Sequence, residues 1–121
     1  PRDTIKSPEE IEILIKRYGG EKLARTLGRL RGSANAIIAL GQVMHHGGDG
    51  GQVALGYLAQ SLIHANADVR VNAEEQLKQL TDTNLVVQLI RMLENTALHE
   101  RIMEILKQID HPEARQIISK G

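Results

Sequence analysis

The residue types that could do chemistry in this 121-residue chain gather first near its N-terminal end. Lys22, Arg25 and Arg29 are spaced by three and four residues, and Arg31 follows closely. In a helix, such spacing places side chains within about 60° of one another on one face. This face could contact nucleic-acid phosphates or an acidic partner, or it could be a solvated surface that Glu21 partly neutralises. Aromatic residues do not alternate with these cations, so any nucleic acid would be held through phosphates rather than stacked bases.

Histidine and carboxylate side chains do not follow a metal-ligand pattern. His45 and His46 precede Asp49, but adjacent residues of a helix point about 100° apart, so both imidazoles cannot easily reach one ion. The chain has no histidines four residues apart and no cysteine to supply a thiolate. We therefore predict neither a metal site nor a cofactor.

A catalytic nucleophile is equally hard to assign. Without cysteine the nucleophile would be a serine, and neither Ser61 nor Ser119 has a histidine and an acid arranged near it in the sequence. Glu74 and Glu75 lie at helical positions that ordinarily face water. The sequence therefore predicts a protein that is not an enzyme and has no catalytic residues.

The composition favours one helical domain. Hydrophobic residues make up 41% of the chain and charged residues 25%, while aromatic residues make up only 2%, with no Phe or Trp. A core must therefore be built from Leu, Ile, Val, Met and Ala, which fill helix–helix interfaces well.

The sequence also bears on localisation. No apolar run approaches the roughly 18 residues of a membrane span, and the lack of cysteine fits a reducing compartment, so we expect a cytoplasmic protein.

Net charge is zero, but the charge is unevenly distributed. Residues 1–35 carry eight Lys and Arg against five acids, whereas residues 36–75 carry one against four. A long-range field that draws the whole molecule to nucleic acid is not expected, although a local patch can still act. The first residue is Pro, which indicates either a removed initiator or a piece of a longer chain.

Residues that commonly start or end helices divide the chain into short helical segments. Ser7 and Pro8 form a helix start, and Gly19-Gly20 ends that helix. Two further helices follow, and four glycines within residues 47–51 predict a loose loop or hinge. We therefore expect N-terminal helices over 1–46, a glycine-rich loop over 47–51 and helical repeats over 52–121, together forming one compact domain.

The second half of the chain contains an internal repeat. Apolar positions of one helix recur 31 residues later, as Leu55, Leu58, Ala59 and Leu62 match Val86, Leu89, Ile90 and Leu93. Those of the next helix recur 29 residues later, as Val69, Ala73, Leu77 and Leu80 match Leu98, Ile102, Leu106 and Ile109. Two helices therefore repeat as a pair, and the difference of two residues falls in the turn between them.

Residues 53–120 resemble the HEAT/armadillo family of helical repeats. Asn66-Ala67-Asp68-Val69-Arg70, followed by Ala73, Leu77 and Leu80, is similar to the turn and second helix of a HEAT repeat, although Ala97-Leu98-His99 departs from the Asp-Val-Arg pattern. The resemblance implies an all-α, right-handed alpha-alpha superhelix, a short solenoid of about seven to eight helices. It also implies an interaction scaffold, while some members bind nucleic acid and a few assist pigment attachment.

Three functions remain open from the sequence. The leading one is a protein–protein interaction scaffold that binds a peptide or protein along its second helices, with contacts at Arg70, Asn72, Gln76, Gln79, Arg101 and Gln108. The alternative is nucleic-acid binding through Lys22, Arg25, Arg29 and Arg31. A helper subunit of a pigment-attachment complex is the third. Because stacked repeats leave an apolar end, we also expect a homo-oligomer or a longer chain, and no membrane partner.

Overall fold

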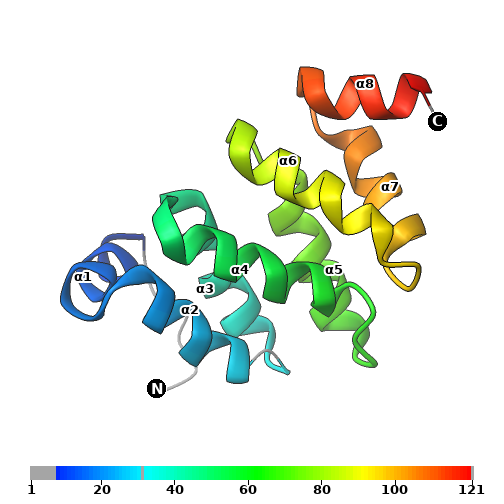
Figure 1. The fold of residues 1–121 in the computed structure, drawn as a ribbon. Coiled ribbons are helices and arrows are strands. Elements are labelled where there is room, and N and C mark those ends of the chain that lie inside the picture. The colour runs from blue at the N-terminus through cyan, green and yellow to red at the C-terminus, as the bar shows by residue number, and fades with distance from the viewer. Residues whose placement is uncertain (1–7, 31, 121) are drawn as a thin grey trace.

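The computed structural model describes residues 8–30 and 32–120, and these residues form helices and turns without a strand. The α-helices appear in Figure 1 and are α1 (Pro8–Tyr18), α2 (Gly20–Arg29), α3 (Ala34–His46), α4 (Gly48–Ser61), α5 (Ala67–Lys78), α6 (Thr83–Arg91), α7 (His99–Gln108) and α8 (Pro112–Lys120). A short 3-10 helix, η1 (Met92–Glu94), continues α6. The predicted all-α class is confirmed.

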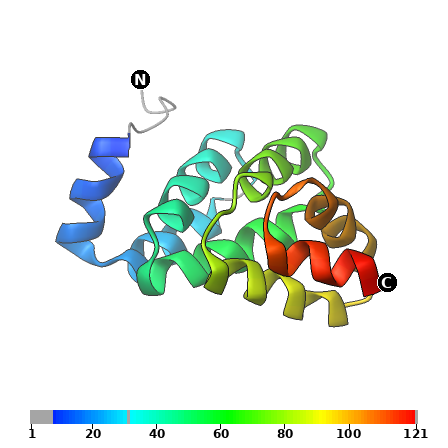
Figure 2. The ribbon, with the colours of Figure 1, turned by 90° about the horizontal axis from the view of Figure 1, so that it is seen from above.

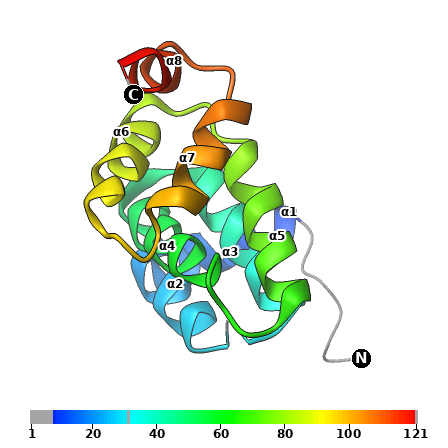
Figure 3. The same ribbon diagram turned by 90° about the vertical axis from the view of Figure 1, so that its right-hand side faces the viewer.

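The helices pack in two rows. In one row α2, α4, α6 and α8 contact one another in that order, and in the other α1, α3, α5 and α7 do the same. Figure 2 shows α3, α5 and α7 side by side with α4 and α6 in front of them, and Figure 3 shows the same separation from the end of the molecule. Each helix therefore packs against the helix two positions along the chain, and the helices from α1 to α5 also pack against their sequence neighbours.

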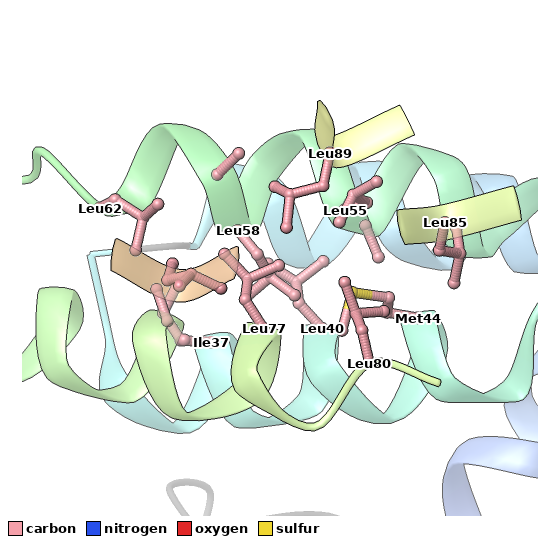
Figure 4. Close-up of a cluster of buried hydrophobic side chains, with 14 of the residues drawn as sticks. Ile37, Leu40, Met44, Leu55, Leu58, Leu62, Leu77, Leu80, Leu85 and Leu89 are labelled. Atoms are coloured by element: carbon pink, nitrogen blue, oxygen red, sulfur yellow. The ribbon is translucent and has the colours of Figure 1, made fainter. Parts of the chain in front are cut away.

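The core lies between the two rows. Leu40 and Met44 of α3, Leu55 and Leu58 of α4, and Leu77 of α5 are fully buried there and converge in Figure 4. The buried side chains of this core cluster are aliphatic or methionine, as the composition predicted. Burial of a large aliphatic side chain contributes about 1.5–3 kcal/mol, so this cluster supplies much of the driving force that holds the rows together.

The repeated helix pair is visible in the burial pattern and in one hydrogen bond. The matched positions of α4–α5 and α6–α7 all belong to the core or pack against it. Arg70 donates from Nη1 to the carbonyl oxygen of His64 at 2.6 Å. Twenty-nine residues later, Nδ1 of His99 lies 2.9 Å from the carbonyl oxygen of Leu93. The histidine therefore contacts the same turn position that Arg70 contacts in the preceding pair.

The glycine-rich segment is not a loop. α4 begins at Gly48, and both Gly50 and Gly51 are buried within it, so the predicted loop over residues 47–51 is wrong. Gly50 lies against the backbone of Gly20, and a Cβ atom there would be 2.6 Å from the Gly20 Cα. The glycine lets α2 and α4 approach closely. Within this segment, Gly47, at φ 90°, and Gly48, at φ 71°, use the positive φ that glycine tolerates.

Other helix boundaries follow local signals. Gly19, at φ 90°, ends α1 as predicted. Asn66 caps α5 by accepting a hydrogen bond from the backbone N–H of Asp68 at 2.8 Å. Ser33 precedes α3 at the N-cap position but forms no side-chain cap bond. Ser7 lies outside the described residues. No helix in the described part of the chain has the length and apolar character needed to cross a membrane.

Candidate functional site

A cleft of about 680 Å³ opens beside α2 at the N-terminal end of the molecule. Its walls come from α1, from α2 and from the turn that joins α3 to α4. We call it the basic cleft, and its lining residues are Ile15, Tyr18, Gly19, Gly20, Glu21, Lys22, Arg25, Thr26, Arg29, His46, Gly47, Gly48, Asp49 and Gly50. Lys22, Arg25 and Arg29, which were predicted from the sequence to share one helix face, therefore line the same cleft.

Packing of α2 explains why these cations face outward. Ala24 and Gly28 are buried against the neighbouring helices. Lys22, Arg25 and Arg29 lie on a different face of the helix and are exposed. The close approach of Gly20 to Gly50 brings the first turns of α2 and α4 together, so the glycine turns form the other wall of the cleft.

The three cations differ in their partners. Arg25 is held by Glu21, which accepts hydrogen bonds from its Nη2 at 2.9 Å and its Nε at 3.1 Å. This hydrogen bond and the charge of Glu21 raise the pKa of Arg25, and Tyr57 acts weakly in the same direction. Among the described residues, no carboxylate lies in ion-pair contact with Lys22 or Arg29. Their charges are therefore available to an anionic ligand.

Two further hollows flank α4. One, of about 330 Å³, lies between α2 and α4 and is lined by Arg25, Gln52, Val53, Gly56, Tyr57 and Gln60. The other, of about 380 Å³, lies between α4 and the end of α6 and is lined by Gly56, Ala59, Gln60, Arg91, Met92, Glu94, Asn95 and Leu98. We call the two together the α4 groove. This groove was not predicted from the sequence, in which its one local signal is Gly56, a glycine inside a helix.

Of the six residues predicted to line a binding groove, five lie on α5 and α7, and Gln79 is the C-cap residue that follows α5. Arg70 bonds to the carbonyl oxygens of His64 and Ala65, and Asn72 donates to the carbonyl oxygen of Asp68, so both serve their own helix and turn. Gln108 makes a similar bond, at 3.5 Å, to Glu104.

The other three of the six differ in exposure. The side chain of Gln76 packs over Gly41 of α3, where a Cβ atom could not fit. Gln79 and Arg101 are exposed. None of the hollows described above is lined by any of the six residues, which remain predicted contact positions.

The remaining candidate residues from the sequence are Arg31 and the group of His45, His46 and Asp49. Arg31 lies outside the described residues, so only three of the four predicted nucleic-acid contacts are placed. His46 and Asp49 line the basic cleft, whereas His45 packs toward the backbone of Gln76. Within residues 8–30 and 32–120, no three His, Asp or Glu side chains are close enough to hold a metal ion.

Comparison of the chain with protein-family models, with curated proteins and with solved structures finds no match.

Proposed function

We propose that this chain is a non-catalytic binding domain of the helical-repeat type, and that the basic cleft receives an acidic segment of a partner protein. The observation that carries the proposal is the convergence of Lys22, Arg25 and Arg29 on one cleft of about 680 Å³ in a chain whose net charge is zero. Carboxylates pair well with arginine through charge-assisted hydrogen bonds. Partner binding at this cleft is thus a local electrostatic contact rather than a property of the whole surface.

The proposal includes the finer fold, a right-handed alpha-alpha superhelix of the HEAT or armadillo kind. Two observations support it: the helices contact one another in two ordered rows, and the pair α4–α5 matches the pair α6–α7 in its buried positions. Repeats of helix pairs form extended surfaces that serve as scaffolds for partners. The cysteine-free sequence fits a reducing compartment such as the cytoplasm.

A second candidate, nucleic-acid binding, uses the same cations. It is favoured by Lys22 and Arg29, which have no carboxylate partner among the described residues and could each neutralise a phosphate. Against it, residues 36–75 carry one Lys or Arg and four acids, so the cations do not continue as a track along the molecule. A nucleic acid presents a phosphate at every nucleotide, whereas an acidic peptide can present a compact group of charges. The protein partner is therefore the better fit.

The test compares two labelled probes by fluorescence anisotropy on the full chain: a peptide of four glutamates and a twelve-nucleotide single-stranded DNA. Tighter binding of the peptide, lost in the double variant Lys22→Glu/Arg29→Glu, is the expected result. The matched control is Lys107→Glu/Arg115→Glu, which makes the same charge change on α7 and α8. Both pairs are exposed. The control also breaks the ion pairs from Lys107 to Glu104 and from Arg115 to Asp110, exposed contacts that contribute about 0–1 kcal/mol each, so circular dichroism is used to check that both double variants are folded.

Each alternative has its own result. Tighter binding of the DNA, with a slope of log K against log salt of about −2 for three phosphate contacts, would favour the nucleic-acid function. Peptide binding that survives Lys22→Glu/Arg29→Glu and is lost in Arg101→Glu would place the site on the α5–α7 surface that the sequence predicted.

A further inference from the structure

Gly56 lies in the middle of α4, and no packing contact requires a glycine at this position. A glycine inside a helix lowers stability relative to alanine, so such a position calls for an explanation. Within helices, the other described glycines at negative φ each have a close neighbour at the Cβ position. A Cβ atom at Gly28 would meet the Tyr57 ring, and one at Gly41 the Gln76 side chain. Gly20 and Gly50 lie against each other's backbone, and a Cβ atom at Gly51 would lie 3.2 Å from the carbonyl oxygen of Met44. At Gly56 nothing lies within 4 Å of the Cβ position.

The space over Gly56 belongs to the α4 groove. Gly56 and Gln60 line both of its hollows, so the two hollows meet across the helix at this point. The hollow between α2 and α4 also shares Arg25 with the basic cleft. The three hollows therefore adjoin one another through shared lining residues, in the order from the basic cleft past Arg25, over Gly56, and on to Arg91.

The charge and polarity of the lining side chains change along this surface. The basic cleft supplies cations, and Arg91 supplies another at the far end, where Glu94 stands beside it. Between them, the hollow lined by described residues of α2 and α4 contains no carboxylate, and α4 contributes the amides of Gln52 and Gln60. An amide side chain can both donate to and accept from a peptide backbone. The surface thus has charged ends and, beyond Arg25, a middle of uncharged, hydrogen-bonding residues.

We infer that an extended peptide segment of a partner protein crosses α4 with its main chain against Gly56, and places acidic side chains at the basic cleft and at Arg91. This inference rests on the proposed function and adds the path of the segment and its pattern of charge. Main-chain contact requires a surface without a protruding side chain, which Gly56 supplies. A nucleic acid suits the path less well, because its phosphates would cross the uncharged middle.

The experiment measures Kd for two labelled peptides on the full chain. The short probe is the four-glutamate peptide, which fits the basic cleft alone. The long probes join the four glutamates to two more through eight alternating serines and alanines, in both sequence orders. The variants are Gly56→Leu, Gly56→Ala and the control Ala67→Leu, which adds similar bulk at an exposed position of α5.

The unaltered chain is expected to bind one long probe more tightly than the short one. Gly56→Leu should weaken that long probe by about tenfold, because its side chain would occupy the path of the bound main chain. Gly56→Ala, which should fold at least as well as the unaltered chain, should weaken the same probe by a smaller factor. Neither change should alter short-probe binding, and Ala67→Leu should alter neither.

Other outcomes separate this inference from the proposed function. Equal affinity for short and long probes, or long-probe binding unchanged in both Gly56 variants, overturns the path across α4. In either case, short-probe binding that is lost in Lys22→Glu/Arg29→Glu leaves the proposed function standing. No binding of any probe by the unaltered chain overturns both.

Discussion

From the contact between α2 and α4 we predict that alanine substitutions at two glycines of α4, Gly50 and Gly56, change stability in opposite directions. Replacing Gly50 with alanine puts a Cβ atom 2.6 Å from the Cα of Gly20, where ordinary contacts begin near 3.4 Å. The obstructing atoms belong to a backbone and cannot rotate away, so α2 and α4 must move apart. Replacing Gly56 with alanine puts the same atom into open space.

The magnitudes follow from these environments. Overpacking of this kind costs about 1–3 kcal/mol, and alanine recovers up to about 1 kcal/mol of helix propensity, so Gly50→Ala should lose about 1–2 kcal/mol. Gly56→Ala meets no obstruction and should gain about 0.5–1 kcal/mol. At about 4 °C per kcal/mol for a chain of this size, Tm should differ by about 6–12 °C between the two variants.

The assay is thermal and urea unfolding followed by far-ultraviolet circular dichroism. Gly50→Ala should melt below the unaltered chain and Gly56→Ala above it, with unchanged urea m-values because the folded state keeps its extent of burial. A Gly50→Ala variant that melts at or above the unaltered chain would refute the close approach of α2 and α4. Equal shifts in one direction for both variants would refute the contrast between their environments.

Three further predictions concern stability. Asn66→Ala removes the cap bond to the Asp68 N–H, and urea unfolding should show a loss of about 1 kcal/mol, whereas no change would contradict this cap. Leu58→Ala empties a fully buried core position, and the same assay should show a loss of about 2–5 kcal/mol, with a smaller loss indicating a looser core. Partial desolvation of its ring lowers the pKa of His45 from the ordinary 6.5, with the backbone of Gln76 opposing the shift. The folded state therefore binds this proton less readily than the unfolded state, so stability should fall as pH drops through 6.5, and His45→Gln should lessen that fall in unfolding titrations from pH 7.5 to 5.5.

Local patterns determined much of the fold. Apolar residues at helical spacing marked the buried stripes of α4 to α7, and their recurrence at 31 and 29 positions marked equivalent helices. Gly19 marked the end of α1 through a positive φ that is a property of the residue itself. The spacing of Lys22, Arg25 and Arg29 likewise predicted one helix face, because side-chain direction in a helix depends only on position.

Contacts between distant residues decided the rest. A glycine can mark a loop, where the fold needs its backbone freedom, or a close contact between helices, where the fold needs its small size. The residues next to Gly50 in the sequence do not distinguish these two roles. What distinguishes them is Gly20, thirty residues away, whose backbone lies against it. The same holds for the site: the sequence by itself determined which side chains carry charge and which face of α2 bears them, whereas the cleft and the α4 groove exist only because tertiary packing sets α2, α4 and α6 side by side.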